Sequence, residues 1–127
     1  MKPFSTLTAV FGLCLAIGSA ATFTSLTPQQ TAAAKASLNQ FFVQNGQMLP
    51  TAVRLAFHDC VGNSCDGCIN LDNASNAGLA EVVTALDSVY IDSGYDSVMS
   101  RADFWFLASI VAVERGIFIN NRRCDWD

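Results

Sequence analysis

The sequence predicts an all-α fold, and three observations support this prediction. Apolar residues recur at spacings of three and four over residues 76–90, as on one face of a helix. Two segments open with a capping box, in which Thr27 precedes Gln30 and Ser100 precedes Asp103 by three positions. No stretch shows the clear alternation of apolar and polar residues expected of a half-buried strand.

The first twenty residues differ from the rest and read as a secretory signal peptide. They contain one basic residue, Lys2, then an apolar run over about 7–17 and small residues at 18–21. The run is shorter than the ~20 apolar residues that span a bilayer, so a membrane anchor is the alternative reading. Residues 21–127 then form one small domain, and we expect a secreted protein with no membrane segment in its mature form.

Charge excludes one class of partner. Without Lys2, six basic residues face eleven acidic ones, a net charge of −5. No basic patch is present, so we expect no nucleic-acid binding.

Residues 28–45 and 50–60 are predicted as the first two helices. Pro28 follows the Thr27 cap, and Gly46 is placed to end the first helix in a left-handed conformation. The second helix is apolar on more than one side and therefore central in the packing. In it Arg54 and His58 are four residues apart, so both lie on one face.

The remaining segments alternate between loop and helix. Residues 61–75 are rich in Gly, Asn, Ser, Asp and Cys and are predicted as a loop, before the helix over 76–90 and a turn over 91–98. The helix that begins near Ser100 is apolar nearly all round, so we expect it to be buried and to end at Gly116. No regular structure is predicted for residues 117–127.

Arg54, Phe57 and His58 form the candidate active face. An always charged guanidinium and a titratable imidazole beside an aromatic ring suit acid–base chemistry on a small polar substrate. An ordinary half-buried histidine and a solvated arginine would give the same spacing, so the pair alone leaves the function open.

Three ordered motifs carry a family resemblance: RLAFHD at 54–59, SNAGL at 75–79 and SRADFWFLASIVAVE at 100–114. Together they resemble the distal, N-terminal half of the plant, fungal and bacterial haem peroxidase superfamily, over about residues 38–114. The resemblance implies the distal half of that all-α fold, with Arg54, His58 and Asn76 as catalytic residues. Phe57 would pack along haem b, and a phenylalanine at this position resembles the secreted members of the superfamily.

The resemblance also implies the reactants. Hydrogen peroxide would be the oxidant, and an unidentified reducing substrate the donor. His58 would move the peroxide proton, Arg54 would stabilise developing negative charge, and Asn76 would fix the imidazole tautomer. From the residues alone, Asn76 also suits a helix cap.

Four cysteines follow the signal peptide and allow three pairings: Cys60, Cys65, Cys68 and Cys124. The resemblance implies a Cys60–Cys65 disulfide in the loop and leaves the other two unassigned. It also implies a calcium site that orders the loop, with ligands from Asp59, Gly62, Ser64 and Asp66. Cys68 stands where the family has a hydroxyl ligand, and a thiol suits calcium poorly.

The sequence contains a single histidine, so the proximal histidine that holds iron in the family has no counterpart here. Two alternatives to a haem peroxidase represented by a partial chain follow. One is a truncated, non-catalytic secreted interaction module. The other is a small domain held by disulfides or by zinc, with His58, Cys60, Cys65 and Cys68 as metal ligands.

Overall fold

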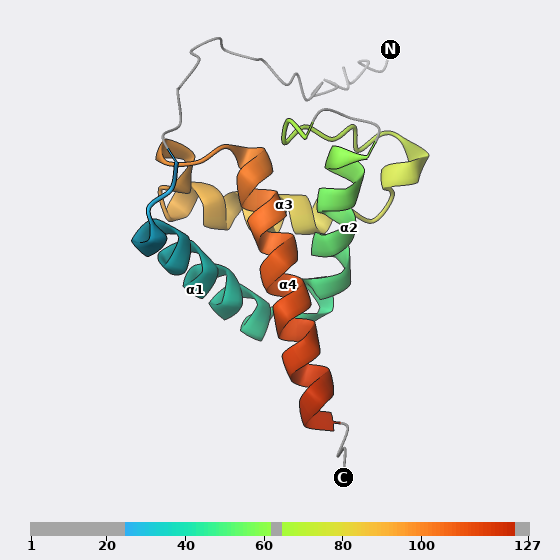
Figure 1. Ribbon diagram of the computed structural model, residues 1–127. Coiled ribbons are helices and arrows are strands. Elements are labelled where there is room, and N and C mark those ends of the chain that lie inside the picture. The colour runs from blue at the N-terminus through green and yellow to red at the C-terminus, as the bar shows by residue number, and fades with distance from the viewer. Residues whose placement is uncertain (1–24, 62–64, 124–127) are drawn as a thin grey trace, which may run out of the picture.

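The computed structural model describes residues 25–61 and 65–123, and all regular structure within these ranges is helical (Figure 1). The all-α prediction is therefore confirmed. The four longer helices are α1 (Pro28–Gln44), α2 (Leu49–Cys60), α3 (Ala80–Asp92) and α4 (Arg101–Arg123). Three short 3-10 helices join them: η1 (Gly46–Met48), η2 (Ala74–Asn76) and η3 (Tyr95–Ser97). The predicted signal peptide, residues 1–20, and Cys124 lie outside the described residues.

Helix α4 is the centre of the arrangement. Figure 1 shows α1 and α2 on either side of it, with α3 crossing near its N-terminal half. The last turns of α4 extend beyond the other helices. The core lies where α4 meets its neighbours and takes large side chains from all four helices: Leu38, Phe42, Leu55, Leu86, Phe104 and Trp105.

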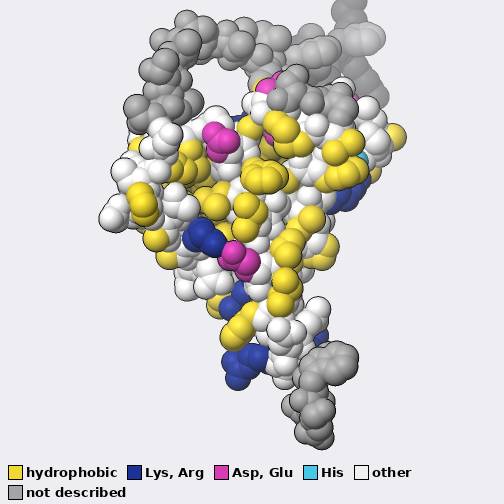
Figure 2. All heavy atoms as spheres, in the orientation of Figure 1, with side chains coloured by type: hydrophobic (Ala, Val, Ile, Leu, Met, Phe, Trp, Pro, Cys, Tyr) yellow, Lys and Arg dark blue, Asp and Glu magenta, His cyan; other side chains and the backbone are white. Residues whose placement is uncertain are grey.

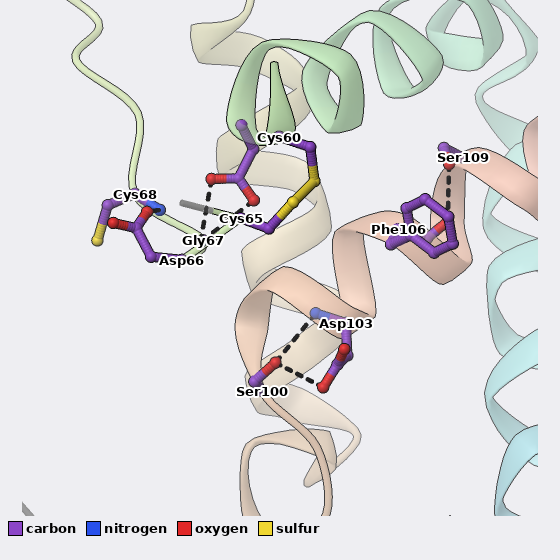
Figure 3. Close-up of a disulfide and its surroundings, with 10 residues drawn as sticks. Cys60, Cys65, Asp66, Gly67, Cys68, Ser100, Asp103, Phe106 and Ser109 are labelled. Carbon is purple, nitrogen blue, oxygen red and sulfur yellow. Dashed lines mark hydrogen bonds between the residues drawn. A yellow bond between two sulfur atoms is a disulfide. The ribbon is translucent and has the colours of Figure 1, made fainter. Parts of the chain in front are cut away.

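Both predicted capping motifs begin a helix, but only the one at Thr27 forms a complete capping box. The Thr27 hydroxyl accepts the Gln30 backbone N–H at 3.2 Å, and the Gln30 side chain accepts the Thr27 N–H at 2.9 Å. At the start of α4 the Ser100 hydroxyl accepts the Asp103 backbone N–H at 3.0 Å and donates to the Asp103 carboxylate at 2.7 Å (Figure 3). These caps satisfy N–H groups that a helix leaves without intrahelical partners.

The first helix ends close to the predicted residue, but the predicted way of ending it was wrong. Gly46 does not take a left-handed conformation; it begins η1. Asn45 caps α1 instead, because its backbone and side-chain N–H groups both donate to the Phe41 carbonyl, each at 2.9 Å. The chain then turns directly into α2.

The third helix starts later than predicted. Asn76 ends η2, and α3 begins only at Ala80. Gly78 lies between them with φ of 84°, a left-handed conformation that interrupts helical geometry. The segment that carries Asn76 is consequently a tight turn and not the first turn of a helix.

The fourth helix is longer and less buried than predicted. It passes through Gly116 and continues to Arg123, so residues 117–123 are helical. Phe104 and Trp105 are buried, but Phe106 and Val113 on the opposite side are about half exposed. Among the described residues, no helix has the length and apolar character needed to cross a membrane.

Candidate functional site

Two side chains of α2 converge on one short turn. Arg54 and His58, one helical turn apart, both contact residues 75–77 at the end of η2. The predicted shared face of Arg54 and His58 is therefore present, and Asn76 joins it. Residues separated by about twenty positions in the chain thus form one cluster.

Asn76 orients the imidazole. Its side-chain oxygen lies 2.7 Å from His58 Nδ1, and its side-chain nitrogen donates to the Asn70 carbonyl at 2.8 Å. Because a carbonyl only accepts, the Asn70 contact fixes the amide with its oxygen toward His58. His58 Nδ1 must then carry the proton, and in the neutral imidazole Nε2 is the basic nitrogen. Asn76 itself is buried, which keeps water from competing for these bonds.

Arg54 ties α2 to the same turn. Its two terminal nitrogens donate to the Ser75 carbonyl at 2.6 Å and to the Ala77 carbonyl at 2.8 Å. Sequence reasoning assigned a catalytic role to Arg54 and missed this structural one. Gly78 was a sequence signal for this contact, because glycine is the residue that most readily takes a left-handed conformation. Such a conformation turns the neighbouring carbonyls out of helical geometry, where they can accept from a donor.

Phe57 forms an apolar wall beside the imidazole. Its ring meets the His58 ring edge to face with centroids 5.9 Å apart, and its side chain is 59% exposed. On the same helix Val53 is 38% exposed and Val61 follows at 61%. These exposed apolar side chains therefore border the polar cluster formed by Arg54, His58 and Asn76.

The loop after α2 is held by polar and covalent links. The Cys60–Cys65 disulfide is present, as the resemblance implied (Figure 3). The Asp59 carboxylate is buried, and both its oxygens accept the Gly67 N–H, at 3.1 and 3.2 Å. Burial raises the pKa of Asp59, against the lowering effect of the Gly67 hydrogen bond.

The structure bears differently on the two predicted metal sites, calcium and zinc. For calcium, Gly62 and Ser64 lie outside the described residues, and the Asp66 carboxylate accepts the Cys68 N–H at 2.9 Å. Over 25–61 and 65–123, no three His, Cys, Asp or Glu side chains gather closely enough to hold a metal ion. Calcium therefore stays a prediction. The zinc alternative was wrong, because the disulfide removes the Cys60 and Cys65 thiolates that zinc requires.

A second polar cluster, which sequence reasoning missed, anchors the loop to α4. Arg101 donates to both carboxylate oxygens of Asp87 and, at 3.1 Å, to the Gly67 carbonyl. Its guanidinium carbon lies 4.5 Å from the centroid of the Trp105 ring. Asp87 and Arg101 belong to different helices and are fourteen residues apart, so no local spacing rule predicts their contact.

Comparison with known proteins supplies the family. A sequence model described as Peroxidase matches residues 31–119 of this chain. Peroxidase 54 of Arabidopsis thaliana is 25% identical over 119 residues, which is 84% of this chain and 33% of that protein. Peroxidase 60 of the same plant is 30% identical over 81 residues, or 57% of this chain and 24% of that protein. The chain thus spans about a third or less of these relatives, and no solved structure matches it.

Proposed function

This chain belongs to the peroxidase family, and we propose that it forms the distal half of a haem-dependent peroxidase that reduces hydrogen peroxide. The observation that carries the proposal is the chain of hydrogen bonds from Asn70 through Asn76 to His58. It presents a basic nitrogen in a fixed direction beside an arginine and an exposed aromatic ring.

His58 is proposed as the proton carrier. Its Nε2 would take a proton from hydrogen peroxide and return it to the departing oxygen, acting first as general base and then as general acid. Asn76 supports this role because it holds the proton on Nδ1 in both steps. A histidine free to change tautomer would lose the basic nitrogen part of the time.

Arg54 is proposed to stabilise negative charge on the departing oxygen. Two of its five N–H donors bind the carbonyls of Ser75 and Ala77, which fixes the plane of the guanidinium. A charged donor group held in advance needs little reorganisation as charge develops. Arg54 therefore combines a structural and an electrostatic role.

The residues present fit one side of a haem. Phe57 offers an exposed apolar surface directly beside His58, as a flat apolar ring system requires. Haem b, when bound, supplies the redox-active iron at which peroxide is reduced. His58, which is hydrogen-bonded to Asn76, is the only histidine among these 127 residues. The sequence therefore has no second histidine that could ligate iron.

The cellular setting is part of the proposal. We infer secretion, with residues 1–20 as the signal peptide, because the Cys60–Cys65 disulfide persists in oxidising compartments.

The test is a haem titration of the full chain, produced with its disulfide formed, followed by the Soret band and by peroxide-dependent oxidation of a chromogenic donor. Phe57→Ala should weaken haem binding about tenfold, because one large exposed ring loses its apolar contact. Phe118→Ala is the matched control, since that ring is 51% exposed but lies far along α4.

His58→Ala should remove turnover while leaving the helices intact. If the full chain binds no haem, the enzyme proposal fails for these residues, and the non-catalytic interaction module becomes the better reading. If Phe57→Ala and Phe118→Ala weaken binding equally, haem does not use the proposed face.

A further inference from the structure

One short motif of the sequence takes no part in the proposed chemistry. Residues 73–75 read Asn-Ala-Ser, and this is the only Asn-X-Ser or Asn-X-Thr sequence among the 127 residues. In exported proteins such a sequence, with X other than proline, is the acceptor for N-linked sugar. The motif is short enough to occur by chance, so its surroundings in the folded chain decide whether it can carry a glycan.

The three residues of the motif lie at the surface. Asn73 caps η2, and Asn73, Ala74 and Ser75 are all exposed. Figure 1 shows η2 as the short yellow-green turn at the outer edge of the molecule, beyond α2, and Figure 2 shows that edge as open surface in the same orientation. A bulky, hydrated oligosaccharide attached there would extend into solvent and would displace no helix.

The Asn73 amide holds the turn through its oxygen alone. Its Oδ1 accepts the Ser75 backbone N–H at 3.0 Å and the Ser75 hydroxyl at 2.9 Å. Over residues 25–61 and 65–123, Asn73 Nδ2 donates no hydrogen bond. The nitrogen to which a sugar is joined can therefore be substituted without loss of a contact, while the oxygen keeps both of its hydrogen bonds.

Asn76, three residues later in the same turn, shows the opposite arrangement. It is buried, and both polar atoms of its side chain are engaged, the oxygen with His58 and the nitrogen with the Asn70 carbonyl. The Asn76 backbone N–H donates to the Asn73 carbonyl at 2.8 Å, so the two asparagines belong to one rigid turn. One amide thus faces the imidazole, and the other is free for modification on the outer side.

We propose that Asn73 is an N-glycosylation site. The co-reactant is an oligosaccharide carried on a lipid diphosphate. Asn73 Nδ2 forms a bond to the anomeric carbon of the first sugar, and the bond from that carbon to the diphosphate oxygen breaks. The lipid diphosphate leaves with the electron pair, Nδ2 loses one proton, and no group is oxidised or reduced. The proposal rests on secretion, which is part of the proposed function, but not on haem or peroxide chemistry.

The test is expression of the full chain, with its own first twenty residues, in a eukaryotic host that glycosylates exported proteins. Protein from cells and medium should lose the mass of one oligosaccharide on digestion with peptide-N-glycosidase, and peptide mass spectrometry should locate the modification at residue 73. Asn73→Asp should abolish it, because the carboxylate keeps an acceptor for Ser75 but has no nitrogen. Ser75→Ala should abolish it by removing the hydroxyl of the motif. Asn120→Gln is the matched control, since Asn120 is an exposed asparagine on α4 outside the motif.

The outcomes separate the glycan from the secretion on which it depends. Modification of the unaltered chain and of Asn120→Gln, with none in Asn73→Asp, would support the proposal. An unmodified chain recovered from the medium would overturn the glycosylation site and leave secretion standing. An unmodified chain found only in the cytosol would overturn both. A glycan that persists in Asn73→Asp would place the modification elsewhere and overturn the assignment to Asn73.

Discussion

Gly67, in the loop that follows α2, is needed both for its backbone conformation and for its lack of a side chain. Replacing it with alanine tests both requirements. Its φ is 73°, in the left-handed region that residues with a side chain avoid. A Cβ added there would lie 2.8 Å from the backbone nitrogen of Ala102 and 3.0 Å from the Arg101 Cβ. Both atoms belong to the first turn of α4 and one of them is a backbone atom, so the clash is not relieved by moving the end of a flexible side chain.

Gly94 allows the two costs to be separated. Its φ is 71°, almost the same as that of Gly67, but an added Cβ would meet nothing within 4 Å. Gly94→Ala should therefore cost only the backbone term, about 1–2 kcal/mol. Gly67→Ala should cost that amount plus about 1–3 kcal/mol for overpacking, or about 2–5 kcal/mol in total.

Urea unfolding of the oxidised protein, followed by circular dichroism, gives the free energy of unfolding for each variant. The informative quantity is the difference between the two alanine variants, since it removes the shared backbone cost. Losses that agree within about 0.5 kcal/mol would refute the reasoning. They would mean that the loop moves away from α4 at little cost and that Gly67 is needed for its φ alone.

Three further outcomes are expected. Because burial raises the pKa of Asp59 above its usual 3.8, the folded protein holds this proton more tightly than the unfolded chain, so the stability it contributes falls as pH rises from about 3.8 through the folded-state pKa. Asp59→Asn should remove that slope in urea unfolding measured at several pH values, and an unchanged slope would place its origin elsewhere. Replacing Cys60 and Cys65 together by serine should lower the free energy of unfolding by about 2 kcal/mol, because the bridge closes a loop with a sequence separation of only five. Chemical denaturation checks this, and an unchanged midpoint would contradict it. Asn76→Leu should abolish the preference of His58 for the Nδ1–H tautomer, seen in the ¹⁵N shifts of the single imidazole, and a retained preference would show that another group orients the ring.

The sequence predicted those parts of the fold that local chemistry determines. The Thr27 and Ser100 caps work within four residues of the chain, so their sequence patterns identify them directly. The shared face of Arg54 and His58 likewise follows from helical geometry once α2 is assigned. The Cys60–Cys65 pairing came from the family resemblance, because composition alone left three pairings open.

The errors concern two glycines whose backbone conformation was misjudged and the packing of α4. Gly116 looks like a helix end in isolation, but α4 continues because a glycine inside a helix costs only about 1 kcal/mol. Asn76 looked like a helix cap, yet the left-handed Gly78 separates it from α3. The burial of α4 was overestimated because hydrophobicity on all sides predicts that a helix is covered, and the described chain covers only one side of it.

The loop and the histidine form one connected unit. Arg101 holds the Gly67 carbonyl and Asp59 holds the Gly67 N–H, so the loop is fixed to both α4 and α2 at that point. Three residues later, the Asn70 carbonyl sets the direction of the Asn76 amide, and that amide sets the proton on His58. A segment too polar to order itself by apolar burial is thus ordered by a carboxylate, a guanidinium and a disulfide. The orientation of the imidazole consequently depends on contacts at the first turn of α4, well away from the ring itself.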